Sequence, residues 1–263
     1  MQPGFSDTLK YYQFDLLRGA PLQHGIFTRQ GGISPDPWRS LNVGGTVGDA
    51  AARVKENQQR IFKALELDPS NRYEVWQVHS AELVVADAPR ADRAYQKADV
   101  ILTNRPGLAL LMRFADCVPI MLYDPVQHAV GMAHAGWLGT VRGAARAAVQ
   151  GMINEYGSLP GDIVAGIGPS IGPDHYEVGE DVYASYMKAF GGRAGAYFHG
   201  DGSKYLDLWS ANLGQLEDMG VTQVEVAQIC TACETEEWFS HRAERGRTGR
   251  FAAVLSLLPT REG

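Results

Sequence analysis

The residues best placed to do chemistry are a cysteine and a histidine on the two strands of one predicted hairpin, at the same end of it. Two apolar runs, 118–123 and 129–133, flank Asp124-Pro125-Val126-Gln127, and Asp followed by Pro is typical of a type I turn. A pair between the first and last of these four residues sets an antiparallel register that places Cys117 directly opposite His134. Facing Cβ atoms in such a pair are about 4.5–5.5 Å apart. A bulge could shift the register by one, but the thiol and the imidazole would still emerge at the same end of the hairpin.

A Cys–His contact of this kind supports two chemistries. The imidazole can deprotonate the thiol to give a nucleophile, or both can bind a metal ion. A catalytic metal ion needs a third protein ligand, and His79 ends an apolar run where a side chain can turn toward a cleft. His79, Cys117 and His134 would then hold Zn²⁺ with its fourth position open. The alternative for the cysteine taken alone is a small hydrophobic residue in the core.

The remaining cysteines and histidines do not complete a site in the sequence. Cys230 and Cys233 have the spacing C-x-x-C, but no second such pair and no histidine pair accompanies them. We therefore expect no zinc site there. Four further histidines lack partners at ligand spacing and are predicted to be structural: His24, His128, His175 and His199.

Two segments carry cations that could bind an anion. Ser240-His241-Arg242 is followed by further arginines at 245, 247 and 250, and arginine suits bidentate contact with phosphate or carboxylate. Arg29 lies in a glycine-rich loop, 28–32, that could serve the same anion. The alternative for both segments is a solvated loop.

Composition excludes several classes of protein. The chain has 263 residues, 45% of them hydrophobic and 21% charged, with a formal net charge of −6, which argues against a nucleic-acid-binding face built on bulk basicity. No apolar stretch approaches the roughly 20 residues of a membrane span, and the N-terminus lacks the features of a signal peptide. Three cysteines form no even disulfide framework, so we expect a reduced, cytoplasmic protein.

Periodicity predicts an α+β fold in a single domain over residues 1–263. Helices are predicted at 49–67, with Asp49 as N-cap, and at 139–156, 180–190 and 206–219. Strands are predicted at 73–78, 83–86, 100–102, 108–113, 118–123, 129–133, 163–167, 223–227 and 251–257. Consecutive strands without intervening helices argue against a doubly wound parallel sheet, and the absence of G-x-G-x-x-G leaves a dinucleotide site without support.

Several blocks between about residues 25 and 255 resemble the laccase-domain family, also called multicopper polyphenol oxidase-like or purine nucleoside phosphorylase, which includes peptidoglycan editing factors. The blocks are His24-Gly25-Ile26-Phe27-Thr28-Arg29-Gln30-Gly31-Gly32, Ser40-Leu41-Asn42-Val43-Gly44, Gln77-Val78-His79, Ala115-Asp116-Cys117-Val118-Pro119, Ala133-His134-Ala135-Gly136-Trp137, Gly168-Pro169-Ser170-Ile171-Gly172, Tyr176-Glu177-Val178, Phe239-Ser240-His241-Arg242 and Thr248-Gly249-Arg250. One departure is visible, because the family usually has Gly-Trp-Arg-Gly where this chain has Leu138 in place of the arginine.

The resemblance implies a four-layer α/β/β/α sandwich with mixed sheets and a zinc site at His79, Cys117 and His134. It also implies phosphorolysis of adenosine, inosine and methylthioadenosine, with deamination of adenosine. Cu²⁺ could occupy the same ligands, since it outbinds Zn²⁺ at nitrogen and sulfur. A trinuclear copper cluster is usually built from His-x-His pairs, and this chain has none.

The leading hypothesis is therefore a zinc-dependent purine nucleoside phosphorylase that acts on a small-molecule nucleoside and phosphate as a monomer or weak homodimer, without nucleic-acid or membrane partners. Arg29 and Arg242 are expected to hold phosphate or ribose hydroxyls, and Asn42 to hydrogen-bond the substrate. The alternatives are a Cys–His amidohydrolase that removes a wrong amino acid from a peptidoglycan precursor, a copper-dependent polyphenol oxidase side activity, and a non-catalytic zinc-stabilised binding module.

Overall fold

Two mixed six-stranded sheets form the centre of the protein, whose computed structural model describes residues 1–200 and 204–259. The first sheet has, in spatial order, β1 (Gln2–Ser6), β2 (Leu9–Gln13), β3 (Leu22–Phe27), β14 (Phe251–Leu257), β7 (Ala109–Phe114) and β4 (Arg72–Tyr73). The second has β13 (Gln223–Val226), β10 (Val164–Ile167), β8 (Val118–Asp124), β9 (Ala129–Ala135), β6 (Val100–Thr103) and β5 (Leu83–Val85). The helices are α1 (Ala51–Ala64), α2 (Trp137–Arg142), α3 (Ala144–Tyr156), α4 (Glu180–Phe190) and α5 (Leu208–Asp218).

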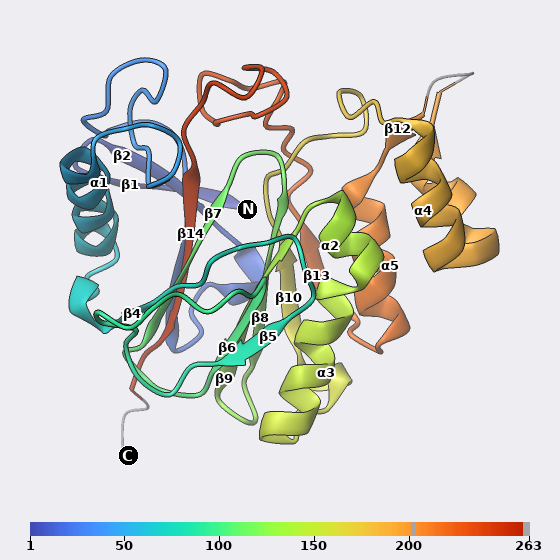
Figure 1. Cartoon of the computed structure of the whole chain (residues 1–263). Coiled ribbons are helices and arrows are strands. Elements are labelled where there is room, and N and C mark those ends of the chain that lie inside the picture. Colours follow the sequence, from blue (N-terminus) through green and yellow to red (C-terminus); the bar gives the residue numbers. More distant parts are fainter. Residues whose placement is uncertain (201–203, 260–263) are drawn as a thin grey trace.

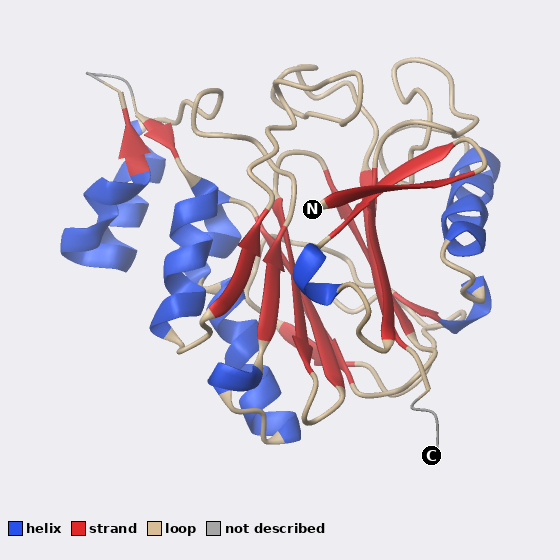
Figure 2. Cartoon of the chain, turned by 180° about the vertical axis from the view of Figure 1, so that it is seen from behind, coloured by secondary structure: helices blue, strands red, loops and turns tan. Residues whose placement is uncertain are grey.

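Alternation of side chains along the strands builds three hydrophobic layers. Along β7, Leu111 packs with residues of α1, whereas Leu110 and Met112 pack with residues of the second sheet. Along β8, Ile120 and Leu122 pack with residues of α3 and α5. The order is therefore α1, first sheet, second sheet and the remaining helices, as Figures 1 and 2 show from opposite sides. The α+β class and the four-layer α/β/β/α sandwich are both confirmed.

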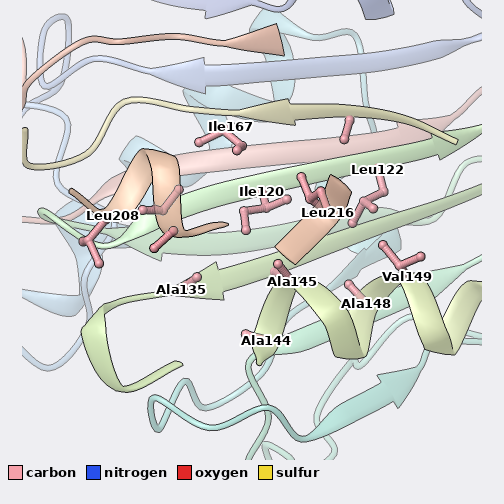
Figure 3. Packing of buried hydrophobic residues seen from close by; sticks show 14 of the residues in the cluster. Ile120, Leu122, Ala135, Ala144, Ala145, Ala148, Val149, Ile167, Leu208 and Leu216 are labelled. Carbon is pink, nitrogen blue, oxygen red and sulfur yellow. The ribbon is translucent and has the colours of Figure 1, made fainter. Parts of the chain in front are cut away.

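Small side chains bring α3 close to the second sheet. Figure 3 shows Ala145, Ala148 and Val149 of α3 turned toward the strands that carry Ile120 and Leu122. At the margin of this helical layer, α4 and the short strands β11 (Phe198–His199) and β12 (Tyr205–Leu206) lie beyond α5 (Figure 1). Among the described residues, none of the helices combines the length and the apolar content that crossing a bilayer requires.

The connections that could form a site gather at one end of the sandwich. Phe114, the last residue of β7, pairs with Phe251, the first of β14, and Val118 at the start of β8 pairs with Ala135 at the end of β9. Because β4 is parallel to β7 and β13 is parallel to β10, the chain after each of these strands leaves at this same end, which is the upper side of Figure 1.

Three predicted elements need correction. The helix predicted at 139–156 is two helices, because Gly143 adopts a left-handed conformation with φ of 83° between α2 and α3. The strand predicted at 73–78 pairs in the sheet only at Arg72–Tyr73. The N-cap of α1 is Ala50 and not Asp49. The Asp49 carboxylate instead accepts hydrogen bonds from the backbone N–H of Ala50 and from the Arg53 side chain.

The hairpin of β8 and β9 also differs from its predicted register. Asp124 pairs with Ala129, so the loop has four residues rather than two, and His128 completes it with a left-handed φ of 49°. The Asp124 carboxylate accepts hydrogen bonds from two backbone N–H groups of the loop, which stabilises this longer turn. His134 therefore pairs with Pro119 instead of Cys117. The shift keeps the side-chain faces unchanged, and the thiol and the imidazole still emerge at the same end.

Candidate metal centre and active-site cavity

His79, Cys117 and His134 meet where the connections gather. His79 follows β4, Cys117 lies in the turn between β7 and β8, and His134 is near the end of β9. Their ring nitrogen and sulfur atoms all lie within 4.8 Å of one another, and the two imidazole centroids are 5.0 Å apart. His134 is buried, Cys117 is half-buried and His79 is exposed. The structure therefore brings together the three residues of the predicted trio, in an arrangement that fits a divalent metal ion with an open side.

A buried carboxylate, Asp99, holds both histidines of this trio. It accepts a hydrogen bond from Nδ1 of His134 at 2.8 Å and from the backbone N–H groups of Val78, His79 and Ser80 at 3.1, 3.0 and 2.6 Å. The contact on Nδ1 leaves Nε2 of His134 to face the site, as metal-binding histidines require. Asp99 was not predicted as a site residue, because its only indication in the sequence is an acidic residue directly before an apolar strand.

Charges within the trio favour a thiolate and a cation beside it. Burial opposes ionisation of Cys117, but the neighbouring His134 outweighs it and lowers the thiol pKa to about 6. Burial also opposes protonation of His134, but Cys117 and the hydrogen bond to Asp99 raise its pKa to about 9. For Asp99, hydrogen bonds led by that from His134 overcome burial and lower the pKa to about 2. The Asp99 carboxylate and the Cys117 thiolate thus lie on either side of the His134 imidazole. A metal cation bound to the trio would be stabilised by the same negative charges.

The backbone makes room for the sulfur. A Cβ atom on Gly136 would lie 2.6 Å from Sγ of Cys117 and 3.3 Å from the ring of His79, so only glycine fits there. Asp116, directly before the cysteine, adopts a left-handed conformation with φ of 83°. Its carboxylate accepts hydrogen bonds from the Thr231 hydroxyl at 2.8 Å and the backbone N–H of Arg242 at 2.6 Å. These contacts fix the turn that presents the thiol.

The trio lies in the wall of a cavity of about 680 Å³. Its lining combines the trio with cationic, aromatic and small side chains. The cationic and aromatic members are Arg113, Arg242, Arg250, Trp76, Tyr95, Trp137 and Tyr176. A cavity of this size can enclose a drug-sized molecule, and such a lining offers contacts for an anion and for a flat ring.

Of the three arginines, Arg242 and Arg250 are the two that form no ion pair with a carboxylate among the described residues. Arg113 forms an ion pair with buried Glu74, and Arg242 donates to the carbonyl of Glu177 at 2.7 Å. Arg250 donates to the carbonyl of Gly249 at 2.7 Å and forms no ion pair with any carboxylate in the described part of the chain. Burial lowers its pKa. Arg250 was predicted as one member of the C-terminal cationic group that could bind an anion, whereas Arg29 and Arg242 were singled out from the sequence.

Arg29 and Asn42 do not line the cavity. The Arg29 side chain donates to the carbonyls of Arg39 and Thr235 and to the Glu244 carboxylate at 2.7, 2.8 and 3.0 Å. Asn42 is fully buried, and its side-chain oxygen accepts from the backbone N–H groups of Gly44 and Arg250. Asn42 therefore positions residues of the lining, whereas Arg242 is itself one of the lining residues.

The position where the chain departs from the family pattern also lies away from the cavity lining. Leu138 is half-buried at the start of α2. One turn later, Arg142 reaches back and donates to the backbone carbonyl of His79 at 2.9 Å. A cation of α2 thus still contacts the loop that carries a predicted ligand.

A second group of metal-ligand side chains forms where the sequence predicted none. Asp174, His175, Cys230 and Cys233 place their ligand atoms within 4.8 Å of one another. The prediction that the cysteine pair lacks partners is therefore wrong, because folding brings in two residues from more than 50 positions earlier.

His24 lies apart from both groups of possible ligands. Its ring accepts a hydrogen bond from the backbone N–H of Phe14 at 2.9 Å in the core, which agrees with a structural role.

Comparisons with known proteins cover nearly the whole chain. The family model described as multi-copper polyphenol oxidoreductase laccase matches residues 23–258. The purine nucleoside phosphorylase SCO2081 of Streptomyces coelicolor is 39% identical over 246 residues, which cover 93% of this chain and 98% of that protein. The purine nucleoside phosphorylase YfiH of Escherichia coli is 35% identical over 233 residues, which cover 88% of this chain and 92% of that protein. The crystal structure of YlmD from Geobacillus stearothermophilus superposes with a TM-score of 0.89 at 32% identity, covering 97% of this chain and 98% of that one.

Proposed function

The chain belongs to the multi-copper polyphenol oxidoreductase laccase family, and we propose that it is a zinc-dependent purine nucleoside phosphorylase. The expected substrates are adenosine, inosine and methylthioadenosine with phosphate, and the expected second activity is deamination of adenosine. Relatives that carry the name purine nucleoside phosphorylase support the reaction class. The three free cysteines support a reducing cytoplasmic location, and we propose a monomer or weak homodimer.

The observation that carries this proposal is the convergence of His79, Cys117 and His134 in the wall of a cavity that also presents Arg250. Two nitrogens and a sulfur with one open side form a ligand set known from catalytic zinc sites. A divalent ion held there would supply Lewis-acid chemistry that polarises a phosphate or water oxygen. Cu²⁺ would accept the same ligands, which makes a weak oxidase activity compatible with the same site.

The chain's own residues supply the binding of both substrates. In phosphorolysis, a phosphate oxygen forms a bond to ribose C1′ as the bond from C1′ to the base breaks, so the cavity must hold an anion beside a purine. Arg250 and Arg242 are the proposed phosphate contacts, since guanidinium groups donate in pairs to phosphate oxygens. Trp76 and Tyr95 are both exposed in the lining with ring centroids 6.4 Å apart, and they offer faces on which a base can stack.

Chromatography of the products tests the proposal. Incubation with inosine should release hypoxanthine and ribose 1-phosphate only when phosphate is present, and adenosine should give inosine without it. The His79→Ala variant should lose both the metal ion held by the cavity trio and the turnover. The matched control His128→Ala removes an imidazole at the far end of the same hairpin and should retain both. Absence of phosphate-dependent base release from any purine nucleoside would refute the phosphorylase assignment.

The rival function is covalent catalysis by a Cys–His pair on an amide, and one observation favours it. The low pKa of Cys117 beside His134 is also the property of a nucleophilic thiolate. The His79→Ala variant separates the two functions, because a Cys–His hydrolase should retain turnover without metal. Trapping of a covalent adduct on Cys117 with a peptidoglycan precursor would support the rival.

A further inference from the structure

The four side chains of the second group lie on two loops that both border the cavity. Asp174 and His175 belong to the connection after β10, and Cys230 and Cys233 belong to the connection after β13. Because β10 and β13 are parallel neighbours, both connections leave the sheet at the same end. We propose that Asp174, His175, Cys230 and Cys233 form a second metal site, a closed structural Zn²⁺ site that joins these two loops.

The distances within the group fit a tetrahedral ion. Nδ1 of His175 lies 3.4 Å from Sγ of Cys233 and 3.8 Å from Sγ of Cys230. The Asp174 carboxylate lies 3.3 Å from Sγ of Cys233 and 3.0 Å from Nδ1 of His175. Tetrahedral Zn²⁺ with ligands at about 2.0–2.3 Å separates those ligands by roughly 3.3–3.8 Å. Small adjustments of the exposed side chains would therefore close a shell around one ion.

The chemistry of the donors selects zinc. Two thiolates, one imidazole and one carboxylate make a combination of ligand types found at zinc sites, and C-x-x-C is the usual spacing of a cysteine pair that holds zinc. The backbone N–H of Gly172 donates to Sγ of Cys230 at 3.2 Å, a contact that stabilises a thiolate. Without a cation, up to three anionic groups would crowd within 4.8 Å of one another. Four protein ligands leave no open position, so the site is structural and does not take substrate.

Contacts next to this second site reach the cavity. Thr231, between the two cysteines, pairs its backbone with Ser170 and donates its hydroxyl to Asp116, which precedes Cys117. Tyr176, the residue after His175, lines the cavity beneath the guanidinium of Arg242 at 5.0 Å. An ion that joins the two loops would therefore hold both the thiol turn and the cationic wall in place.

Zinc analysis in a Cys117→Ser background tests the site, because this change removes the only thiol of the cavity trio. The Cys117→Ser protein, purified under reducing conditions and given Zn²⁺, should retain one equivalent that resists dialysis. Adding Cys233→Ser or His175→Ala should remove that equivalent. The matched control is His199→Ala, which removes another half-exposed histidine beside a carboxylate and should leave the zinc in place. Cys233 is exposed, so its substitution avoids the folding risk of buried Cys230.

Replacement of the zinc by Co²⁺ gives an independent readout. In the Cys117→Ser background, sulfur-to-cobalt charge transfer can arise only from Cys230 and Cys233, and it should weaken in the Cys233→Ser variant. Two results would overturn the proposal. One is a Cys117→Ser/His175→Ala protein that keeps all the zinc of its parent. The other is a Cys117→Ser protein that binds no zinc at all, whether its remaining thiols are free or joined as a disulfide.

Discussion

At the scale of single residues, Asp99 positions both histidines of the trio through several hydrogen bonds. One fully buried carboxylate accepts a hydrogen bond from the His134 ring and three from the backbone of residues 78–80. It therefore fixes the ring orientation of one proposed ligand and the loop position of another. A carboxylate behind a metal-binding imidazole also increases the basicity of that imidazole.

The Asp99→Asn variant should bind the metal about 10- to 100-fold more weakly and lose activity in proportion. The amide keeps one acceptor oxygen but turns an NH₂ group toward backbone donors, so several hydrogen bonds are lost at once. Competition with a chromophoric chelator measures the affinity. The control Glu82→Gln makes the same chemical change at an exposed position nearby and should bind metal as the parent does. Equal affinity in the two variants would show that Asp99 does not support the ligands.

Arg250 gives a second residue-scale prediction. The Arg250→Met variant should raise the KM for phosphate roughly 10- to 150-fold, since a charged hydrogen bond to an anion is worth about 1.5–3 kcal/mol. The KM for the nucleoside should change much less. Steady-state kinetics with each substrate varied in turn separates the two effects. Arg247→Met, which alters an exposed arginine outside the cavity lining, should leave both constants unchanged. An unaltered KM for phosphate would show that Arg250 does not contact the phosphate and that another residue binds it.

The trio could be predicted from sequence because its members are chemically distinctive and two of them flank one turn. Asp99 and Arg250 could not be identified in the same way. An acidic residue before a strand and an arginine in a loop are common, and their meaning here depends on segments that pack together only in the folded chain. Asn42 illustrates the same limit, because it was expected to touch substrate and instead supports Gly44 and Arg250 from behind.

At the scale of elements, helical periodicity located α4 to the residue but could not detect the break between α2 and α3. The apolar spacing continues across Gly143, and only its left-handed φ of 83° redirects the chain. The break turns α2 so that its first residue, Trp137, lines the cavity while α3 covers the second sheet. The first three strands were not predicted, because polar residues or glycines interrupt their apolar residues and none shows a continuous apolar run.

The Gly143→Ala variant should be less stable than the parent by about 1–2 kcal/mol, because a side chain is strained in the left-handed region. A Cβ there has nothing closer than 3.7 Å, so the cost comes from the backbone alone. Urea denaturation measures the free energy of unfolding. Gly161→Ala is the matched control, since Gly161 has no neighbour within 4 Å of a Cβ and no positive φ, and it should be neutral or slightly stabilising. Equal stability of the two variants would exclude a conformational role for Gly143.

At the scale of the whole molecule, the site depends on strand order rather than on any local motif. β14 lies between β3 and β7, so the C-terminal strand completes a sheet begun by the N-terminal hairpin and brings Arg250 to the end of β7. The turn from β7 to β8 then carries the chain from one sheet to the other, and Cys117 lies on that crossing. Periodicity predicts strands but not which strands become neighbours, so neither this cavity nor the Cys230–His175 contact could be obtained from the sequence.

The stability of the whole molecule should carry the signature of one buried histidine in β3. His24 is 1% exposed, its ring stacks on Phe14 with centroids 6.2 Å apart, and burial, aided by nearby Arg18, lowers its pKa from 6.5 to about 4. As the pH falls from 6.5 to about 4, His24 takes up a proton in the unfolded chain but stays neutral in the folded chain. The contribution of His24 to the free energy of unfolding should therefore decline over that window and level off below it.

The pKa difference corresponds to roughly 3 kcal/mol of unfolding free energy lost across the window. Urea denaturation at the two ends of the window should show the parent losing that much more stability than His24→Gln, whose side-chain oxygen can still accept from Phe14 but does not titrate. All other titrating groups are common to both proteins and cancel in the comparison. If both proteins lose the same free energy of unfolding, the acid sensitivity originates at other groups, because the two proteins differ only in whether residue 24 can titrate.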